Sequence, residues 1–524
     1  MGKTIIVSSH ILSELGEVCT NIGIVKDGVV VCQGTVEEVM TMASGEAPIV
    51  FTVLNKEEEA IKLLKELPYV NNIKVDEKKI NPADVEIEIT ESVLIEEPDK
   101  VIKQLSELRE KGFKISLDDF EKINPFPTEK IPYVENGFYF DYDGIGNHPY
   151  HHAGMIYVQE PGAMAPAECV EIHPDWTVLD MCSAPGGKSS QLRNKLGEKG
   201  VLVSNEIIPS RCKILTGNVE RLGLKNTVTT CTDTGKLAKI FPDTFDLIMV
   251  DAPCSGEGMF RKEDIAIEEW SPENVIKCAE RQKEILENAA ICLKNGGYIV
   301  YATCTFSLEE NEMMVDAFLS DHPEFEIVRV REVVEENTED GIFFDGCKCE
   351  DISYARRFYP HKNRGEGQFM AVLHNKNDYY GGFEKPKKKA DKIDKTVFDF
   401  LDDTLTEYNK ENVLMHKGTP IYFTPDFDVK NVTAFSVGLT IGEIKKNYIQ
   451  PHHQFFMAMG ENFKRKINLT AESEEVRKYL HGEEISVDCP NGWAVVMVDG
   501  CALGGAKVSN GRAKNHYPKG LRTK

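Results

Sequence analysis

Two cysteines of this chain follow apolar runs and lie next to small or polar residues. Cys254 occurs in L-I-M-V-D-A-P-C-S-G, three residues after Asp251, and Cys304 occurs in Y-I-V-Y-A-T-C-T-F-S. Short apolar runs that end in turn residues predict buried strands. A buried cysteine is most often a small hydrophobic residue without chemistry, whereas a thiol in a loop beside polar partners is a candidate nucleophile. We therefore expect Cys254, Cys304 and the Asp251 carboxyl group to be catalytic.

These groups favour one kind of reaction. A thiolate can add to carbon 6 of a pyrimidine, which makes carbon 5 a nucleophile toward an activated methyl group. A carboxylic acid near ring nitrogen 3, here Asp251, would stabilise the charge that develops on the ring. A second thiol suits a role in releasing the adduct.

A glycine-rich turn precedes both thiols. The segment V-L-D-M-C-S-A-P-G-G-K (Val178 to Lys188) predicts a strand, a tight turn and the start of a helix. Glycine lets the backbone approach a ligand, and a helix N-terminus presents free amide donors. The candidate cofactor-binding residues of the turn are Cys182, Ser183, Ala184, Pro185, Gly186, Gly187 and Lys188. A plain strand–turn–helix junction would look the same, so the turn alone is weak support for a nucleotide-like cofactor.

Three acids strengthen the cofactor interpretation. Glu206 follows the next apolar run, 19 residues after Gly187, where a carboxylate can accept both hydroxyl groups of a ribose. Asp233 follows the segment T-V-T-T-C-T, which is expected to form the third strand, and is expected to face an adenine amino group. Asp251 follows the fourth. Acids in strand order behind a glycine turn favour a cofactor site over a plain junction.

The elements that must position these residues alternate along the chain. The expected strands are Val178–Met181, Val201–Asn205, Leu247–Asp251 and Tyr298–Tyr301, and longer amphipathic stretches such as Asn274–Leu293 separate them. This alternation predicts an α/β fold, with a Rossmann-like core and a mostly parallel sheet. In such a sheet the carboxyl ends of the strands share one crevice, which is where ligands bind.

Length and composition set the class of protein. A chain of 524 residues predicts two to four domains, and its 41% hydrophobic content is ordinary for a soluble protein. No apolar run is long enough to span a bilayer, and the first residues lack the order of a signal peptide. The 14 cysteines include no C-x-x-C pair, which predicts reduced thiols in the cytoplasm and no metal site.

The net charge of -24 is unevenly distributed. Residues 1–120 carry 13 basic against 23 acidic side chains, whereas residues 436–524 carry 13 against 9. A basic tail with interleaved aromatic rings suits phosphate contact and base stacking, and a solubilising terminus is an equally good interpretation. The candidate RNA-binding residues of the tail are Lys507, Arg512, Lys514, His516, Tyr517, Lys519 and Arg522.

Several motifs together resemble one family. C-S-A-P-G-G-K, D-A-P-C-S-G-E-G-M-F, Y-A-T-C-T-F, R-F-Y-P-H-K-N-R-G-E-G-Q-F and K-N-H-Y-P-K-G-L-R are similar to segments of the RNA (cytosine-5) methyltransferases of the Fmu/Sun class. Within that class the chain resembles bacterial enzymes that act on small-subunit ribosomal RNA. The likeness covers about residues 122–524.

The resemblance implies a function and roles. It implies S-adenosylmethionine as cofactor, held by the residues of the turn with Glu206, Asp233 and Asp251, and methylation of carbon 5 of cytosine in small-subunit (16S) ribosomal RNA or the small ribosomal subunit. It assigns attack to Cys304 and product release to Cys254, although DNA cytosine-5 methyltransferases use a Pro-Cys thiol, which Pro253-Cys254 matches. The alternatives are a transfer RNA methyltransferase and a non-catalytic RNA-binding or ribosome assembly factor. Neither DNA nor a membrane is expected as a partner.

Shifts in composition divide the chain. They predict an α/β core at 121–375, a lysine-rich linker at 376–396 and a small connecting unit at 397–435. The resemblance implies that this core is the methyltransferase core and that a PUA-like RNA-binding domain lies at 436–524.

The first 120 residues are expected to lie outside this family. Residues 1–80 resemble the carboxyl-terminal part of an ABC-transporter ATPase, but no phosphate-binding loop occurs in the chain. Residues 81–120 resemble a piece of an EAL-type phosphodiesterase, in which Glu88 and Asp118 match metal ligands and the other ligands are missing. We interpret this region as a replacement of the family's own amino-terminal RNA-binding segment. The alternative is an acidic adaptor with a partner of its own.

Overall fold

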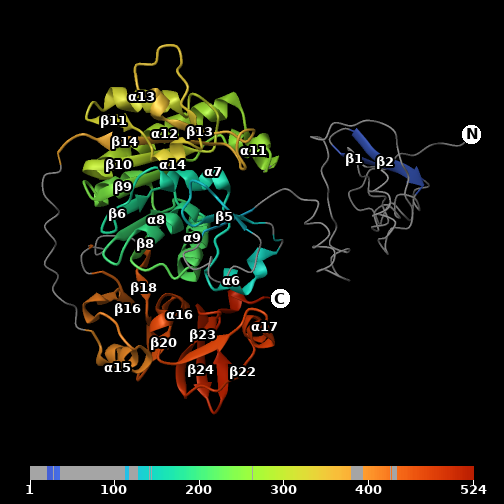
Figure 1. Ribbon diagram of the computed structural model, residues 1–524, viewed down its shortest axis with the longest axis vertical. Helices are drawn as coiled ribbons and strands as arrows, with labels where there is room; N and C mark the ends of the chain where they lie inside the picture. Colours follow the sequence, from blue (N-terminus) through green and yellow to red (C-terminus); the bar gives the residue numbers. More distant parts are fainter. Residues whose placement is uncertain are drawn as a thin grey trace, which may run out of the picture. The chain divides into compact units, whose positions relative to one another are not determined.

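The computed structural model describes residues 21–26, 29–35, 113–116, 128–140, 142, 144–262, 264–378, 393–424, 427 and 434–523. The chain divides into two compact units, Met1–Arg109 and Glu110–Lys524 (Figure 1). In the first unit, β1 (Asn21–Lys26) and β2 (Val29–Thr35) form an antiparallel pair. The expected likenesses to an ATPase and a phosphodiesterase fall mostly outside the described residues.

A mixed sheet of ten strands forms the centre of the second unit. Its order is β12-β13-β14-β10-β9-β6-β7-β8-β17, and β11 also pairs with β14. The five inner strands are parallel: β6 (Thr177–Asp180), β7 (Val201–Asn205), β8 (Thr227–Thr230), β9 (Phe245–Asp251) and β10 (Leu293–Thr303). The antiparallel strands are β11 (Phe325–Val328), β12 (Glu339–Asp340), β13 (Arg356–Phe358), β14 (Gln368–Asn375) and β17 (Ala434–Val437).

Helices cover both faces of this sheet, so successive residues of one strand enter two different cores. Leu179 packs in a cluster with α10, α12 and α13, whereas its neighbour Val178 packs in a second cluster with α8. The helices of this part are α6 (Pro149–His152), α7 (Pro161–Met164), α8 (Gly187–Lys195), α9 (Pro209–Arg221), α10 (Thr234–Ile240), α11 (Asp264–Glu269), α12 (Pro272–Cys292), α13 (Glu312–Asp321) and α14 (Glu332–Glu335). Burial on both faces explains why the inner strands are nearly continuous apolar runs.

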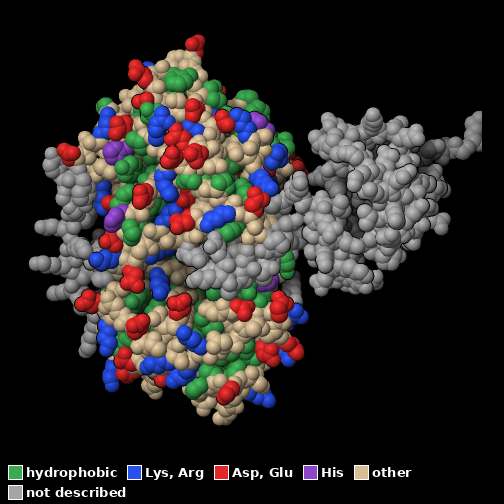
Figure 2. Space-filling view, viewed as in Figure 1, with side chains coloured by type: hydrophobic (Ala, Val, Ile, Leu, Met, Phe, Trp, Pro, Cys, Tyr) green, Lys and Arg blue, Asp and Glu red, His purple; other side chains and the backbone are tan. Residues whose placement is uncertain are grey.

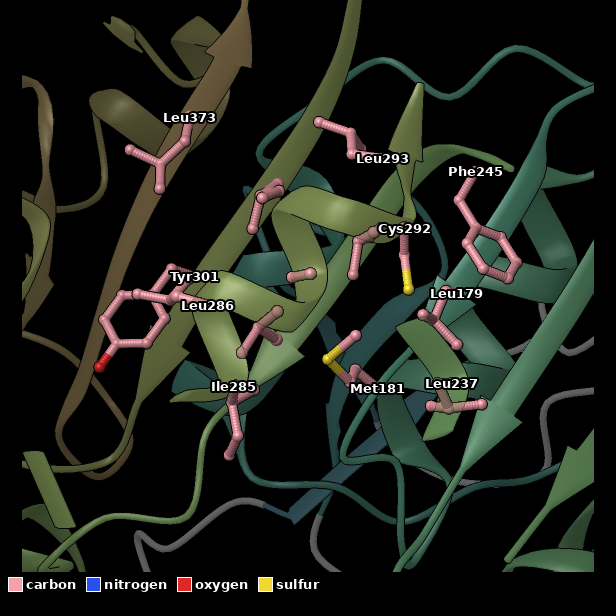
Figure 3. Packing of buried hydrophobic residues seen from close by; sticks show 14 of the residues in the cluster. Leu179, Met181, Leu237, Phe245, Ile285, Leu286, Cys292, Leu293, Tyr301 and Leu373 are labelled. Atoms are coloured by element: carbon pink, nitrogen blue, oxygen red, sulfur yellow. The ribbon is translucent and has the colours of Figure 1, made fainter. Parts of the chain in front are cut away.

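The longest helix shows how local sequence sets an element. α12 begins where the Ser271 side chain accepts a hydrogen bond from Asn274 N and Pro272 occupies the first turn. Its buried residues recur every three or four positions from Val275 to Cys292, as one face of a helix requires. Figure 3 shows Cys292 of this face near Leu179 and Met181. The predicted α/β fold with a mostly parallel sheet is therefore confirmed.

The strand order reverses between β6 and β9. The chain builds β6, β7 and β8 in one direction and then returns to place β9 and β10 on the other side of β6. In an open α/β sheet such a reversal opens a crevice at the carboxyl ends of the strands. The loops after β6 and β9 border this crevice, and they carry the glycine-rich turn and the first thiol.

A small sheet crosses a predicted domain boundary. β3 (Phe113–Ser116) and β4 (Thr128–Lys130) both pair with β5 (Gly137–Phe140) in antiparallel register. β3 lies before the boundary expected at residue 120 and β5 lies after it, and Phe113 pairs with Phe140, so strands from both sides of that boundary share one sheet.

The carboxyl-terminal part contains a separate sheet of five strands, in the order β21-β23-β24-β25-β22. Its elements are α15 (Lys395–Thr404), β15 (Val413–His416), β16 (Thr419–Tyr422), β18 (Leu439–Thr440), β19 (Gly442–Ile444), β20 (Ile449–Pro451), α16 (His453–Met459), β21 (Lys466–Leu469), α17 (Glu474–His481), β22 (Ile485–Ser486), β23 (Gly492–Val498), β24 (Cys501–Ser509) and β25 (Arg512–Asn515). Short 3₁₀ helices lie at Ile145–Asn147, Ala165–Glu168, Glu257–Met259, Ile352–Tyr354, Lys410–Asn412, Gly460–Asn462 and Lys519–Leu521.

The connecting unit expected at 397–435 is not separate from its neighbours. Val397 and Phe400 of α15 share a core with Phe456 and Val495 of the carboxyl-terminal part. The expected boundary at residue 435 also cuts β17, which pairs with β8 at the edge of the central sheet. Shared packing and shared strands therefore join this segment to both neighbours.

Within the described ranges, no helix has the length and apolarity needed to cross a membrane. The same ranges contain no group of three or more histidine, cysteine or acidic side chains placed to hold a metal ion. On the face shown in Figure 2, basic and acidic side chains are intermixed rather than gathered by sign.

Candidate active site

The two candidate thiols meet at the carboxyl edge of the sheet. Cys254 Sγ lies 3.3 Å from Cys304 Sγ. The strands explain this proximity, because β9 and β10 are parallel neighbours that pair Asp251 with Ala302, so their following loops leave the sheet together. The contact with Cys304, reinforced by burial, raises the pKa of the Cys254 thiol well above its usual range. Cys254 therefore keeps its proton at neutral pH.

An ion pair lies beside the thiols. Lys188 Nζ on α8 reaches Asp251 at 2.8 Å, and the side chains are 8% and 34% exposed. Burial alone would lower the pKa of Lys188, but the Asp251 carboxylate outweighs it and raises that pKa. Lys188 was expected to hold a cofactor as part of the glycine-rich turn. Its ammonium group instead faces Asp251 across the reversal between β6 and β9.

The glycine-rich turn can admit a ligand close to its backbone. Gly186 has a φ of +113°, which favours glycine. The space beside Gly187 is filled by Gln159, whose side chain would lie 2.8 Å from a Cβ there, so this glycine allows Gln159 and not a ligand to approach the backbone. Gly186 is the N-cap of α8 and makes no side-chain cap hydrogen bond to the amides of the first turn. The Asp180 Oδ1 atom below the turn is buried and has no hydrogen-bond partner among the described residues. These features fit S-adenosylmethionine, whose carboxylate suits a helix N-terminus.

Helix α9 holds the turn from one side. Arg211 donates a 2.9 Å hydrogen bond to the Ala184 carbonyl, and Asn218 donates a bond of the same length to the Pro185 carbonyl. Arg211 also lies 3.4 Å from Glu206. The turn and Glu206 are thus fixed relative to each other through one side chain.

The two other candidate cofactor-binding acids, Glu206 and Asp233, differ in burial and in their partners. Glu206 directly follows β7, its side chain is 4% exposed, and one carboxylate oxygen accepts a 2.9 Å bond from Ile208 N. Asp233, whose side chain is 45% exposed, caps α10, accepts a 2.9 Å bond from Lys236 N and pairs with Lys236 Nζ at 3.0 Å. These contacts lower its pKa. Glu206 is therefore a buried group at the crevice, whereas Asp233 is already satisfied by its own helix.

Sequence reasoning missed a buried amide behind the crevice. Asn205, the last residue of β7, donates to the carbonyls of Met181 (3.2 Å) and Thr232 (3.0 Å). It accepts a 2.8 Å bond from the Thr230 hydroxyl. One side chain thus ties together the ends of three strands. Its signal in the sequence is a polar residue at the end of the apolar run V-L-V-S-N.

A second missed residue lies below the thiols. The Glu310 carboxylate accepts hydrogen bonds from Ser255 N (3.0 Å), from the Ser255 hydroxyl and from Gln282 Nε2 (2.7 Å). Burial raises its pKa, although these donors act against the shift. Ser255 also lies 2.9 Å from the Thr305 hydroxyl. Glu310 therefore joins the loop that carries Cys254 to the loop that carries Cys304, and nothing in S-L-E-E-N-E distinguishes it from its acidic neighbours.

Part of the predicted RNA-binding tail is unavailable to RNA. Tyr517 is 2% exposed, and its hydroxyl lies 2.8 Å from His152 Nδ1 of α6. The expectation that this ring stacks on a base is therefore wrong, because the ring is buried in a core that α6 shares with the carboxyl-terminal sheet. His516 and Arg522 are half-buried; His516 packs edge-on against Trp493 at 4.6 Å, and Arg522 donates to the Tyr517 carbonyl at 3.3 Å.

The remaining tail cations are exposed. They are Lys507, Arg512, Lys514 and Lys519. Lys507 Nζ lies 5.4 Å from the ring centroid of Trp493 and 6.0 Å from that of Tyr448, which is 51% exposed. This surface combines positive charge with an accessible aromatic ring, and its contact with RNA stays a prediction.

Three family models match successive parts of the chain. The model described as 16S rRNA methyltransferase RsmB/F matches residues 167–374, and that of the methyltransferase RsmF PUA domain matches residues 466–523. The N-terminal domain of 16S rRNA methyltransferase RsmF matches residues 87–161. The expectation that the family likeness begins only near residue 122 is therefore wrong, because the family's own amino-terminal domain reaches back to residue 87.

Curated relatives match over most of their length. Ribosomal RNA small subunit methyltransferase F of Shewanella woodyi is 30% identical over 440 residues, which are 79% of this chain and 90% of the relative. The protein of the same name from Vibrio parahaemolyticus is 28% identical over 448 residues, with the same coverage. Among solved structures, a methyltransferase homolog from Pyrococcus horikoshii is 24% identical, with a TM-score of 0.44 over 53% of this chain and 91% of that protein.

Proposed function

Since this chain belongs to the RsmB/F family of 16S ribosomal RNA methyltransferases, we propose that it methylates carbon 5 of a cytosine in small-subunit ribosomal RNA through a covalent cysteine adduct. The coarser activity, S-adenosylmethionine-dependent RNA methylation, follows from the family. The observation that carries the finer proposal is the meeting of two thiols, Cys254 and Cys304, 3.3 Å apart at the edge of the sheet.

Cys304 is the proposed nucleophile. As a thiolate it forms a bond from Sγ to carbon 6 of the cytosine, and the electron pair of the 5,6 double bond becomes available at carbon 5. The charge that moves into the ring needs a nearby counter-charge. Lys188 and Asp251 form a charged pair next to the thiols, so this pair can stabilise the ring and share a proton with ring nitrogen 3.

Bound S-adenosylmethionine supplies an electrophilic methyl group. Glu206 is the proposed partner of its ribose, because its carboxylate is buried at the end of β7 with an Arg211 counter-ion and can accept two hydroxyl bonds. The amides of the first turn of α8 are the proposed partners of its carboxylate. Cys182 and Ser183 to Gly187 form the wall of that site, and Asp233 can reach it only if it gives up part of its contact with Lys236.

Cys254 is the proposed base of the last step. Carbon 5 must lose its proton so that the bond from Cys304 Sγ to carbon 6 can break and the aromatic ring can return. The raised pKa of Cys254 means that its sulfur holds a proton more tightly than an ordinary thiol does. In this step the Cys254 thiol first releases its own proton to water, and the resulting thiolate takes the proton from carbon 5. The bond from Cys304 Sγ to carbon 6 then breaks, and Cys304 leaves as a thiolate.

The experiment separates the proposed reaction from its alternatives. Purified protein is tested for thermal stabilisation by S-adenosylmethionine and then for transfer of labelled methyl groups to 16S ribosomal RNA, assembled small subunits and transfer RNA. The expected result is label in 5-methylcytosine of ribosomal RNA. The proposed place of action is the cytoplasm. Label on another base, or in transfer RNA alone, would contradict the proposal. Binding of RNA without any transfer would favour an assembly factor.

A further inference from the structure

A cavity lies next to the thiols and is not used by the proposed reaction. It has a volume of about 400 Å³, and its lining includes Glu257, Arg261, Phe306, Tyr359, His361 and Glu366. Neither thiol is part of its lining, and neither is Asp251 or Lys188. It is therefore a neighbour of the catalytic groups and not the space that must receive the target base.

The topology places the cavity at the same edge of the sheet as the thiols. Glu257 follows Cys254 by three residues, and Phe306 follows Cys304 by two. Tyr359 lies in the loop between β13 and β14, and β14 runs antiparallel to β10 with Phe369 paired to Thr303. Three loops from adjacent strands thus form one wall. Backbone hydrogen bonds join them, from Gly258 N to the Cys304 carbonyl (2.9 Å) and from Gly367 N to the Gly258 carbonyl (3.2 Å).

The cavity presents flat ring surfaces. Phe306 and Tyr359 are stacked with centroids 5.9 Å apart and planes 14° apart, and the exposed His361 lies 5.4 Å from Tyr359. The Glu257 carboxylate fixes the Phe306 end, because it accepts a 3.0 Å bond from Phe306 N. Such a surface suits a planar, unstacked base.

The rim of the cavity carries charge suited to a nucleic-acid backbone. Arg261 is 61% exposed and lies 3.2 Å from Glu366, so its outer face is open to solvent. Lys262 is exposed on the loop of Arg261, and Lys362, exposed on the loop of Tyr359, pairs with Glu339 at 2.9 Å. A phosphate can therefore approach the rim while the base enters the ring-lined interior.

We infer that this cavity binds the unpaired nucleotide next to the target cytosine, with its base on Tyr359 and His361 and its phosphate near Arg261. The inference rests on the proposed function. A base that leaves its stack to reach a thiol exposes a face of its neighbour to water. The rings of Tyr359 and His361 replace that lost stacking, and Tyr359 itself stacks on Phe306, which follows Cys304 by two residues. The cavity therefore helps to hold the RNA in the strand geometry that delivers the cytosine.

The test uses the full chain and fluorescein-labelled, single-stranded RNA nonamers with one cytosine at the centre of adenosines. Matched RNAs carry an abasic nucleotide in place of the adenosine on one side of the cytosine or on the other. Fluorescence anisotropy measures each dissociation constant for the wild type, Tyr359→Leu, His361→Ala and Arg261→Gln. The matched control is His173→Ala, an exposed histidine ahead of β6, at the opposite end of that strand from the glycine-rich turn.

The wild type and His173→Ala should bind one of the abasic RNAs about 5- to 100-fold more weakly than the intact RNA. In Tyr359→Leu and His361→Ala, the ratio of the two dissociation constants, abasic RNA to intact RNA, should fall most of the way to one. Arg261→Gln should weaken both RNAs equally, because a phosphate contact is the same in both. Thermal unfolding checks each variant, and the exposed His361 serves if Tyr359→Leu is unstable.

A wild type that does not distinguish the RNAs, or variants that keep its ratio, would overturn the inference. Methyl transfer to 16S ribosomal RNA is measured in parallel. If the wild type transfers methyl groups but binds the abasic and intact RNAs equally, only the assignment of the cavity is wrong. If the wild type transfers methyl groups to no RNA, the proposed function is wrong.

Discussion

Cys254 and Cys304, fifty residues apart in the chain, hold their sulfur atoms 3.3 Å from each other. Two thiols at this distance cannot both be anions without strong repulsion, so at most one member of the pair is ionised at a time. The raised pKa of Cys254 makes it the member that keeps its proton. The pair thus contains a candidate nucleophile and a candidate base without any further residue.

Substitution of each thiol should stop the reaction at a different step. Cys304→Ala should abolish methylation and any protein–RNA adduct, because no thiolate reaches carbon 6. Cys254→Ala should form the adduct and fail to resolve it, so a species stable to denaturant should accumulate. Denaturing gels with 16S ribosomal RNA measure both results, and Cys278→Ala, a buried cysteine on α12, is the control. Adduct in Cys304→Ala and none in Cys254→Ala would reverse the roles, and full activity of both variants would exclude a covalent mechanism.

The Lys188–Asp251 pair should act as a unit. Asp251→Asn and Lys188→Gln should each slow adduct formation about 10- to 100-fold, because each removes a charge that stabilises the ring. The double variant should be little slower than either single variant, since the second substitution removes a partner already lost. Single-turnover rates with saturating cofactor measure the effect. Fully additive losses would show that the two side chains act separately.

Loss of Glu206 should weaken the cofactor and leave RNA binding unchanged. Glu206→Ala removes the acceptor of the two proposed ribose bonds, each worth at most about 1.5–3 kcal/mol. Calorimetry with S-adenosylmethionine measures the change, and the exposed Glu284→Ala on α12 is the control. An affinity equal to that of the wild type would remove Glu206 from the site.

Stability should fall as pH rises because of Asp180. Burial, opposed by the Ser189 hydroxyl at 2.6 Å, raises the pKa of this carboxyl from 3.8 to about 7. The folded state therefore holds a proton that the unfolded state loses between these values, and stability declines through this window by up to about 4 kcal/mol. Asp180→Asn lacks this titration, so its denaturant midpoint should decline less between pH 4 and pH 7.5. Parallel declines in both proteins would place the titration on another group.

Exposed tail cations should position RNA without reading bases. Lys507→Ala, Arg512→Ala and Lys514→Ala should each reduce the slope of log affinity against log salt by about 0.7–0.9, whichever RNA sequence is used. Point substitutions are needed because the tail contains β24, an inner strand of its sheet, and the buried Tyr517. The exposed Lys277→Ala on α12 is the control. Unchanged slopes would leave these residues with a solubilising role.

Local patterns determined the central fold and the identity of the reactive groups. Strands that are buried on both faces tend to be apolar runs, so Val201–Asn205, Leu247–Asp251 and Tyr298–Tyr301 could be predicted as strands. The full extent of β10, from Leu293 to Thr303, could not. The types of the residues that follow the strands, thiols and acids, limited the chemistry. The strands and the types of the residues that follow them depend on neighbours in the sequence, so they could be predicted from this sequence alone.

Only the tertiary structure decided which side chains meet. Lys188 faces Asp251, Glu310 joins the two thiol loops, and Tyr517 is buried against His152. Each of these contacts joins residues that are far apart in the sequence. Such residues meet only when the strands take their order and the core packs, so no local pattern predicts the contacts. The sequence determined the reactive groups, and packing decided which of them face the crevice, which support it from below and which are withdrawn from solvent.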